Sequence, residues 1–175
     1  TMMVDLKNPV IEKSRVWEHN RVFNETATML VQQIPLLVFE HNNMTGMLPD
    51  MVGHLTSLED LSLSNNSITG AIPSGLRNLT SLYGLDLTLN QLTGQIPMLP
   101  SSLTRLAISM NSLSGPLPLD FGAPDLTDLS LFSNCLTGHV PRAICELKNL
   151  LLLDLSNNLF EGEFPWCSAM SSMEF

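Results

Sequence analysis

The residues of this chain that are best suited to chemistry are acidic ones in short segments that resemble one another. Asp60 lies in "LEDLSL", Asp86 in "LYGLDL", Asp128 in "LTDLSL" and Asp154 in "LLLLDL", while Arg105 lies in the related "LTRLAI". Two carboxylates in different environments within a cleft are what glycoside hydrolysis requires. Carboxylates on an open surface bind cationic groups instead. The elements that position these side chains decide which chemistry applies.

Other catalytic and metal-binding patterns are missing from the sequence. The histidines share no spacing that suits a metal, and no Cys-x-x-Cys occurs. They are His19, His41, His54 and His139. Phosphate-binding loops, nucleophile elbows and kinase signatures are also absent. We therefore expect neither a metal site nor a cofactor.

The composition excludes several classes of partner. Charged residues make up only 14% of the chain, and the net charge is −9 without any run of basic residues. Such a chain is poorly suited to nucleic acid or to an anionic membrane surface. No apolar stretch approaches the roughly 20 residues of a membrane-spanning helix. The N-terminus lacks the basic start and apolar core of a signal peptide, but it does not begin with Met, and both ends look cut.

One repeated frame dominates the rest of the sequence. Six copies begin at residues 34, 58, 82, 103, 126 and 150, at intervals of 21 to 24 residues. Apolar residues occupy positions one, four and six of every copy, Gly occupies position 13 and Pro position 16. Position nine is Asn each time: Asn42, Asn66, Asn90, Asn111, Asn134 and Asn158.

The frame predicts a stack of short parallel strands. Apolar residues two apart indicate a strand with one buried face, too short to be stable unless it pairs with the next copy. The Asn is expected to point inward and to bond backbone groups of the turn. Apolar residues at positions 19 and 22 of copies one, two and five predict a short helical turn. The third copy is expected to be extended there.

The frame L-x-x-L-x-L-x-x-N-x-L resembles the leucine-rich repeat. The continuations "ITGAIP", "LTGQIP" and "LSGPLP" are similar to the plant-specific class, and "LDLSNNLFEGEFPWC" resembles plant receptor-like proteins and receptor kinases of this family. The resemblance implies an α/β solenoid, a right-handed superhelix with a parallel concave β-sheet. It also implies second short strands, short 3-10 or helical turns on the convex side, and an extracellular location at the cell surface.

We divide the chain into three parts. Residues 1–33 fit no copy and form a cap, an insertion or a disordered segment. Residues 34–172 hold six plant-type repeats, and residues 173–175 begin a truncated seventh repeat. The family's paired-Cys N-terminal cap, C-terminal Cys cap, membrane span and kinase domain are missing. The chain is therefore interpreted as an internal piece of a longer ectodomain or a truncated product.

Positions three, five and seven of each strand face the concave side, opposite the buried leucines. Five carboxylates and one Arg make this face acidic. One interpretation is a surface for a basic or mixed peptide, with Phe132 as an aromatic anchor and Arg105 as an anion contact. The other is that Asp86 and Asp154 belong to the common "LDL" form and only solvate the sheet. The candidate ligand-binding residues are Asp60, Ser62, Asp86, Arg105, Asp128, Phe132 and Asp154.

Cys145 and Cys167 occupy positions 20 and 18 of consecutive copies. Because neighbouring copies stack roughly 5 Å apart, we expect these two residues to form a disulfide on the convex side and Cys135 to stay free. Three ordinary thiols are the alternative. Four Asn-x-Ser/Thr sites are candidates for glycosylation: Asn24, Asn43, Asn65 and Asn78.

Three functions remain open at this point. The first is a non-catalytic recognition module of a plant cell-surface receptor, which binds a peptide, a carbohydrate or a co-receptor protein in defence or development signalling. The second is a secreted inhibitor of a cell-wall-degrading polygalacturonase. The third is a truncated structural remnant without a partner. We expect no enzyme, since nothing obvious on an open sheet desolvates the aspartates.

Overall fold

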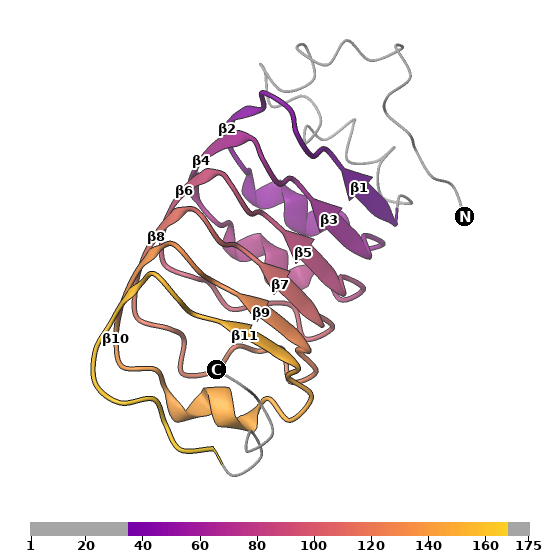
Figure 1. The fold of residues 1–175 in the computed structure, drawn as a ribbon. Helices are drawn as coiled ribbons and strands as arrows, with labels where there is room; N and C mark the ends of the chain where they lie inside the picture. The colour runs from indigo at the N-terminus through magenta and orange to yellow at the C-terminus, as the bar shows by residue number, and fades with distance from the viewer. Residues whose placement is uncertain (1–34, 168–175) are drawn as a thin grey trace, which may run out of the picture.

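The computed structural model describes residues 35–167 of the chain. Within this range the chain winds into successive coils, one for each copy of the frame, and each coil contributes one strand to each of two parallel sheets (Figure 1). The α/β solenoid expected from the frame and from the resemblance is confirmed. The division of the chain into three parts stays a prediction, since residues 1–33 and 173–175 lie outside the described residues.

The first sheet lines the concave side, and each of its strands covers positions three to five of one copy. Equivalent positions pair across the sheet, so that Asp60 lies opposite Gly84 and Gly84 lies opposite Arg105. The strands are, in spatial order, β1 (Leu36–Val38), β3 (Asp60–Ser62), β5 (Gly84–Asp86), β7 (Arg105–Ala107), β9 (Asp128–Ser130) and β11 (Leu152–Asp154).

A tight turn leads from each strand of the first sheet to the second sheet. The residue at position eight has a positive φ of 52° to 57° in every coil. This turn was not predicted from the sequence, because six residues of five types occupy the position: His41, Asn65, Leu89, Met110, Ser133 and Asn157. The second sheet consists of β2 (Thr45–Met47), β4 (Ser67–Ala71), β6 (Gln91–Gly94), β8 (Ser112–Gly115), β10 (Cys135–Gly138) and β12 (Leu159–Phe160).

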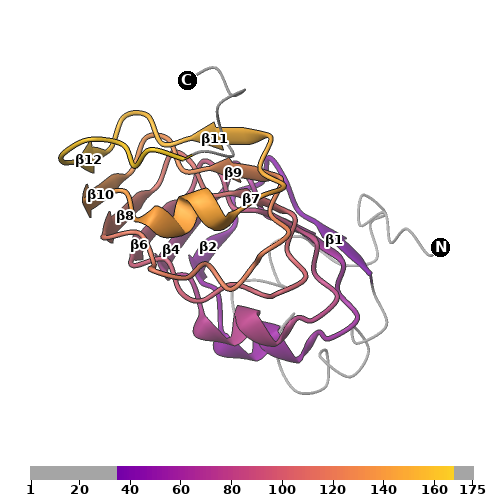
Figure 2. The ribbon, with the colours of Figure 1, turned by 90° about the horizontal axis from the view of Figure 1, so that it is seen from below.

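The convex side differs from coil to coil. Short 3-10 helices occur in the first, second and fifth coils, as predicted: η2 (Asp50–His54), η3 (Ser74–Asn78) and η4 (Arg142–Glu146). Helices η2 and η3 lie side by side (Figure 2). The third coil is extended, as predicted, and so is the fourth. In the fourth coil the buried ring of Phe121 takes part in the core.

The core is a set of aliphatic columns that run along the solenoid between the two sheets and the convex side. Position four of successive coils supplies one such column, in which Leu61, Leu85, Leu106 and Leu129 are at most 2% exposed. Because the side chains of a strand alternate between its two faces, burying this column fixes positions three and five on the concave side. The core therefore sets the direction of every candidate binding residue on the strands.

Candidate functional site

The concave sheet carries a depression of about 320 Å³ that extends from β1 to β9. We call it the concave depression. Five of the candidate ligand-binding residues line it, together with Glu40, Gly84 and Ala107, which the sequence analysis did not select. The five are Asp60, Ser62, Asp86, Arg105 and Asp128.

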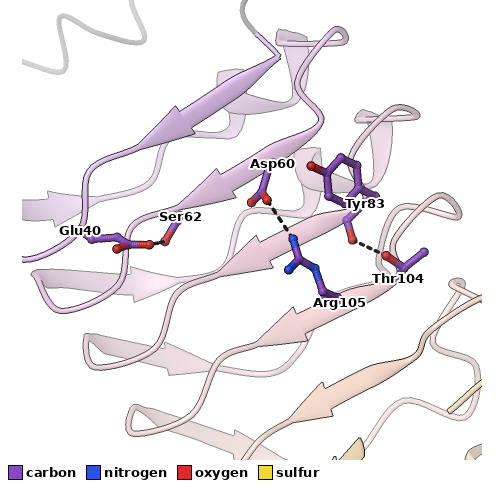
Figure 3. A network of polar contacts seen from close by, with 6 residues as sticks. All are labelled: Glu40, Asp60, Ser62, Tyr83, Thr104 and Arg105. Atoms are coloured by element: carbon purple, nitrogen blue, oxygen red, sulfur yellow. Dashed lines mark hydrogen bonds and ion pairs between the residues drawn. The ribbon is translucent and has the colours of Figure 1, made fainter. Parts of the chain in front are cut away.

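An ion pair between Asp60 and Arg105 crosses the depression (Figure 3). The guanidinium of Arg105 donates to Asp60 Oδ2 over 3.0 Å, although the two residues belong to β3 and β7, with β5 between them. Gly84 of β5 makes this reach possible. A Cβ at position 84 would lie 2.9 Å from Asp60 Cγ, closer than non-bonded carbon atoms approach. Gly84 is therefore part of the site because it has no side chain.

The aromatic ring of Tyr83 supports Arg105 from the rim of the sheet. The Arg105 guanidinium carbon lies 5.6 Å from the centroid of this ring, within the range of a cation–π contact. Thr104 Oγ1 donates to the Tyr83 carbonyl oxygen over 3.0 Å. Arg105 nevertheless keeps 56% of its side chain exposed, whereas Asp60 keeps 21%. The arginine is thus anchored by two contacts and still accessible from the depression.

The other carboxylates of the depression are held by local hydrogen bonds. Ser62 Oγ donates to Glu40 Oε1 over 2.7 Å (Figure 3). The Thr88 N–H donates to Asp86 Oδ1 over 2.9 Å, and Thr127 Oγ1 donates to Asp128 Oδ2 over 2.6 Å. Each acid keeps further acceptor capacity, because an ionised carboxylate accepts about four hydrogen bonds.

Asp60 has an unusual environment for a carboxylate that is paired with an arginine. Burial raises the pKa of Asp60 above 3.8, and the neighbouring negative charges of Asp86 and Glu40 add to the rise, while Arg105 opposes it. From the sequence we expected nothing obvious to desolvate the aspartates, and for Asp60 that expectation is wrong. The Asp60 side chain keeps only 21% of its surface exposed, on a strand that is flanked by β1 and β5. A perturbed acid in a depression marks a candidate functional site.

Two candidate residues lie elsewhere. Phe132 is partly buried and does not line the concave depression. Asp154 lines a separate recess of about 390 Å³ in the last coil, where Asp154 Oδ1 accepts hydrogen bonds from the Ser156 N–H and Ser156 Oγ. The structure therefore does not bring these two side chains together with the other five.

The asparagines at position nine form a ladder through the molecule. In coils two to six, Oδ1 accepts the N–H of position 11 in the preceding coil, as Asn90 does from Ile68 over 3.0 Å. Nδ2 donates to the position-six carbonyls of both coils, here Leu63 and Leu87. Asn42 differs, since the described residues include no preceding coil, and its Nδ2 donates only to the Glu40 carbonyl. We call these six residues the asparagine ladder.

Cys145 of η4 and Cys167 of the last coil form a disulfide, with their Cα atoms 5.1 Å apart. Cys135 is a free, exposed thiol. Of the candidate glycosylation sites, Asn43, Asn65 and Asn78 are exposed, and Asn24 lies outside the described residues. Asn65 Nδ2 contacts His41 Nδ1 at 2.5 Å.

Two further features are absent between residues 35 and 167. No helix in this range is long and apolar enough to cross a membrane. The same residues contain no group of three or more His, Cys, Asp or Glu side chains that could hold a metal ion.

Comparisons with known proteins point to one family. The family described as Leucine rich repeat matches residues 34–92 and again residues 149–169. Receptor-like protein 7 of Arabidopsis thaliana is 39% identical over 136 residues, which are 78% of this chain and 12% of that protein. The chain thus spans only a small part of the length of this relative.

Solved structures agree with this assignment. The ectodomain of the Arabidopsis receptor kinase SOBIR1 is 36% identical, with a TM-score of 0.67 over 72% of each chain. The Arabidopsis receptor kinase HAESA, in complex with the peptide hormone IDA and the co-receptor SERK1, is 33% identical, with a TM-score of 0.70 over 77% of this chain and 24% of that one. Together with the repeated frame and the two parallel sheets, these matches show that the chain belongs to the plant leucine-rich-repeat family and resembles the ectodomains of its receptor-like proteins and receptor kinases.

Proposed function

We propose that the chain is part of a non-catalytic, extracellular recognition module of a plant cell-surface receptor, and that it binds a peptide or protein ligand in the concave depression. The observation that carries this proposal is the set of side chains that line the depression. Glu40, Asp60, Asp86 and Asp128 supply four carboxylates against the single guanidinium of Arg105. This balance of charge favours a ligand with basic side chains.

The depression is suited to binding rather than to catalysis. Its floor is a strand surface with short side chains, such as Ala107 and Ser130, so an extended chain can approach that part of the sheet closely. The carboxylates project from separate strands onto an open surface rather than into a closed cleft, where acid–base chemistry would be sheltered from water. The relation to HAESA, whose ectodomain is known in complex with a peptide hormone and a co-receptor, supports a peptide ligand and a co-receptor ectodomain as partners.

The extracellular location has separate support. A disulfide such as Cys145–Cys167 persists in oxidising compartments. The exposed positions of Asn43, Asn65 and Asn78 are compatible with glycosylation, which we propose for all three. Asn78 lies on η3 of the convex side, away from the concave depression.

A direct test is the affinity of synthetic ten-residue peptides of net charge +3, 0 and −3, measured by isothermal titration calorimetry at two salt concentrations. The proposal predicts binding of the cationic peptides that weakens with added salt and falls at least tenfold in the variants Asp60→Asn and Asp86→Asn. The matched control is Thr93→Ala, an exposed position of the second sheet. Equal affinity for all three charge classes, or an equal loss in the control, would overturn the proposal.

The same acidic face would also suit a secreted inhibitor that covers a basic patch on a polygalacturonase. A polygalacturonase assay in the presence of the chain separates the two functions. Inhibition that Asp60→Asn abolishes would favour the inhibitor, whereas peptide binding without inhibition favours the receptor. A chain with neither property would match the remaining alternative, a structural remnant.

A further inference from the structure

Arg105 lies between two acidic side chains on opposite sides of its strand. Asp128 of β9 is its direct partner across the sheet. Asp60 lies on the other side, beyond the intervening strand β5, and is the acid with which Arg105 is paired. The longer reach is open because Gly84 leaves room above β5 for the Asp60 carboxylate, and because the Tyr83 ring supports the guanidinium.

The surroundings of Asp60 disfavour its ionised form, which is the form that holds Arg105 in this position. Three charged groups act on Asp60: Glu40 just after β1, Asp86 on β5 and Arg105 on β7. Asp128 on β9 lines the same depression farther away. Desolvation together with Asp86 and Glu40 outweighs Arg105, so the pKa of Asp60 is raised in spite of the ion pair. Asp60 therefore takes up a proton at a higher pH than an aspartate in water does.

We propose that Arg105 is a pH-operated latch of the concave depression: the ionised carboxylate of Asp60, which lies over Gly84, holds the guanidinium, and protonation of Asp60 releases it toward Asp128. The proton comes from solvent, and no bond other than the O–H bond on Asp60 is formed. The backbone does not need to move, because an arginine side chain has enough rotatable bonds to turn from one neighbour to the other. The latch changes which part of the depression carries positive charge without changing the fold.

This device belongs to the free chain, so its test is independent of any ligand and of the function proposed above. Tyr83 is the only tyrosine of the chain, so its ring signals are unique in an NMR spectrum. The experiment follows the Tyr83 ring protons, the Arg105 side-chain N–H and the Asp60 carboxyl carbon as the pH of the full chain is lowered. The latch predicts that all three change together, with one midpoint above 3.8, the ordinary pKa of Asp60.

The variant Asp60→Asn removes the need for acid, which could unfold the chain. At neutral pH its Arg105 and Tyr83 signals are expected at the positions that the wild type reaches only after Asp60 is protonated, and the pH step should disappear. Unchanged Arg105 and Tyr83 signals in this variant, or a flat response while Asp60 titrates, would overturn the proposal.

A second variant tests where Arg105 goes. Asp128→Asn removes the destination, so the neutral-pH signals of Arg105 are expected to stay and the low-pH signals to move. Identical low-pH signals in Asp128→Asn and the wild type would contradict the step toward Asp128. The matched control is Asp154→Asn on β11, outside the concave depression, which should leave both end points as they are.

Discussion

The asparagine ladder and the concave depression are carried by the same coils, but only one of them repeats. At position nine the residue is always Asn, and in coils two to six it makes the same hydrogen bonds to the preceding coil. At position three of the concave strands four residue types occur and no two neighbouring coils share one: Leu36, Asp60, Gly84, Arg105, Asp128 and Leu152.

This difference separates two physical tasks. The ladder satisfies buried backbone groups, which every coil has in the same places, so every coil needs the same side chain. The depression gains its properties from unlike neighbours, such as an acid and an arginine on either side of a glycine. We therefore expect substitutions in the ladder to act on stability and substitutions in the depression to act on binding.

The largest expected effect comes from breaking the ladder where it is complete. Asn90→Ala removes four side-chain hydrogen bonds and leaves the Ile68 N–H without a partner in the interior. The carbonyls of Leu63 and Leu87 each keep one other donor, the side-chain amide of Asn66 or of Asn111. One unsatisfied buried group costs roughly 1–3 kcal/mol, and each of the three other lost hydrogen bonds adds roughly 0.5–1.5 kcal/mol. We therefore expect a loss of about 3–5 kcal/mol in the free energy of unfolding, measured in urea.

Asn42→Ala is the matched control for this substitution. Asn42 holds the same position, but within residues 35–167 its side chain makes one hydrogen bond, to the Glu40 carbonyl, so its loss should cost less than about 1 kcal/mol. Equal losses in the two variants would mean that the residue type, and not its bonds to the preceding coil, stabilises the fold.

The disulfide is a third case beside the ladder and the depression, because it stabilises the scaffold but occurs only once. Replacing both Cys145 and Cys167 by Ser removes a cross-link between residues that are 22 positions apart in the sequence. This change is expected to lower the free energy of unfolding by about 3 kcal/mol, the chain-entropy value for a loop of this length. The measurement is the urea midpoint, with Cys135→Ser as the control that should not move it.

The smallest expected effect on stability belongs to the depression. In Asp60→Asn the ion pair is lost, but an exposed or half-exposed pair contributes only about 0–1 kcal/mol, and the desolvated charge disappears with it. At pH 7 this variant should be as stable as the wild type or slightly more stable.

The difference in unfolding free energy between the wild type and Asp60→Asn is expected to change with pH in one direction. Because the pKa of Asp60 is raised in the folded chain, the folded state binds the proton more tightly than the unfolded state does. The wild type should therefore gain stability relative to Asp60→Asn as the pH falls through the folded pKa of Asp60 toward 3.8. Unfolding midpoints of both proteins between pH 7 and pH 4 would reveal it, and a gain in the opposite direction would contradict the assigned environment.

The sequence predicted the repeated part of the molecule well, because repetition is itself a signal. The strands, the inward asparagines and the 3-10 helices of coils one, two and five follow from the type and spacing of residues such as Asn90 and Leu76. The turn at position eight was missed. Its residues share a positive φ angle, but they do not share a residue type from which that angle could be predicted.

The site was only partly predictable. Asp60 and Arg105 were selected for their charge, but their pairing across β5 depends on Gly84, which was passed over because it carries no functional group. A lone Gly among concave positions that otherwise have side chains was the available signal. The raised pKa of Asp60 also needed the structure, since burial depends on how deeply a side chain lies between neighbouring strands.

The central claim is that the ladder maintains the fold and the depression provides recognition. The most direct test is the affinity of the triple variant Asp60→Asn, Asp86→Asn, Asp128→Asn for the +3 peptide. The urea unfolding curve of the same variant is measured beside that of the wild type, as a control for folding. The account predicts an unchanged curve and a loss of peptide binding of at least tenfold. An unchanged affinity with a folded triple variant would contradict it.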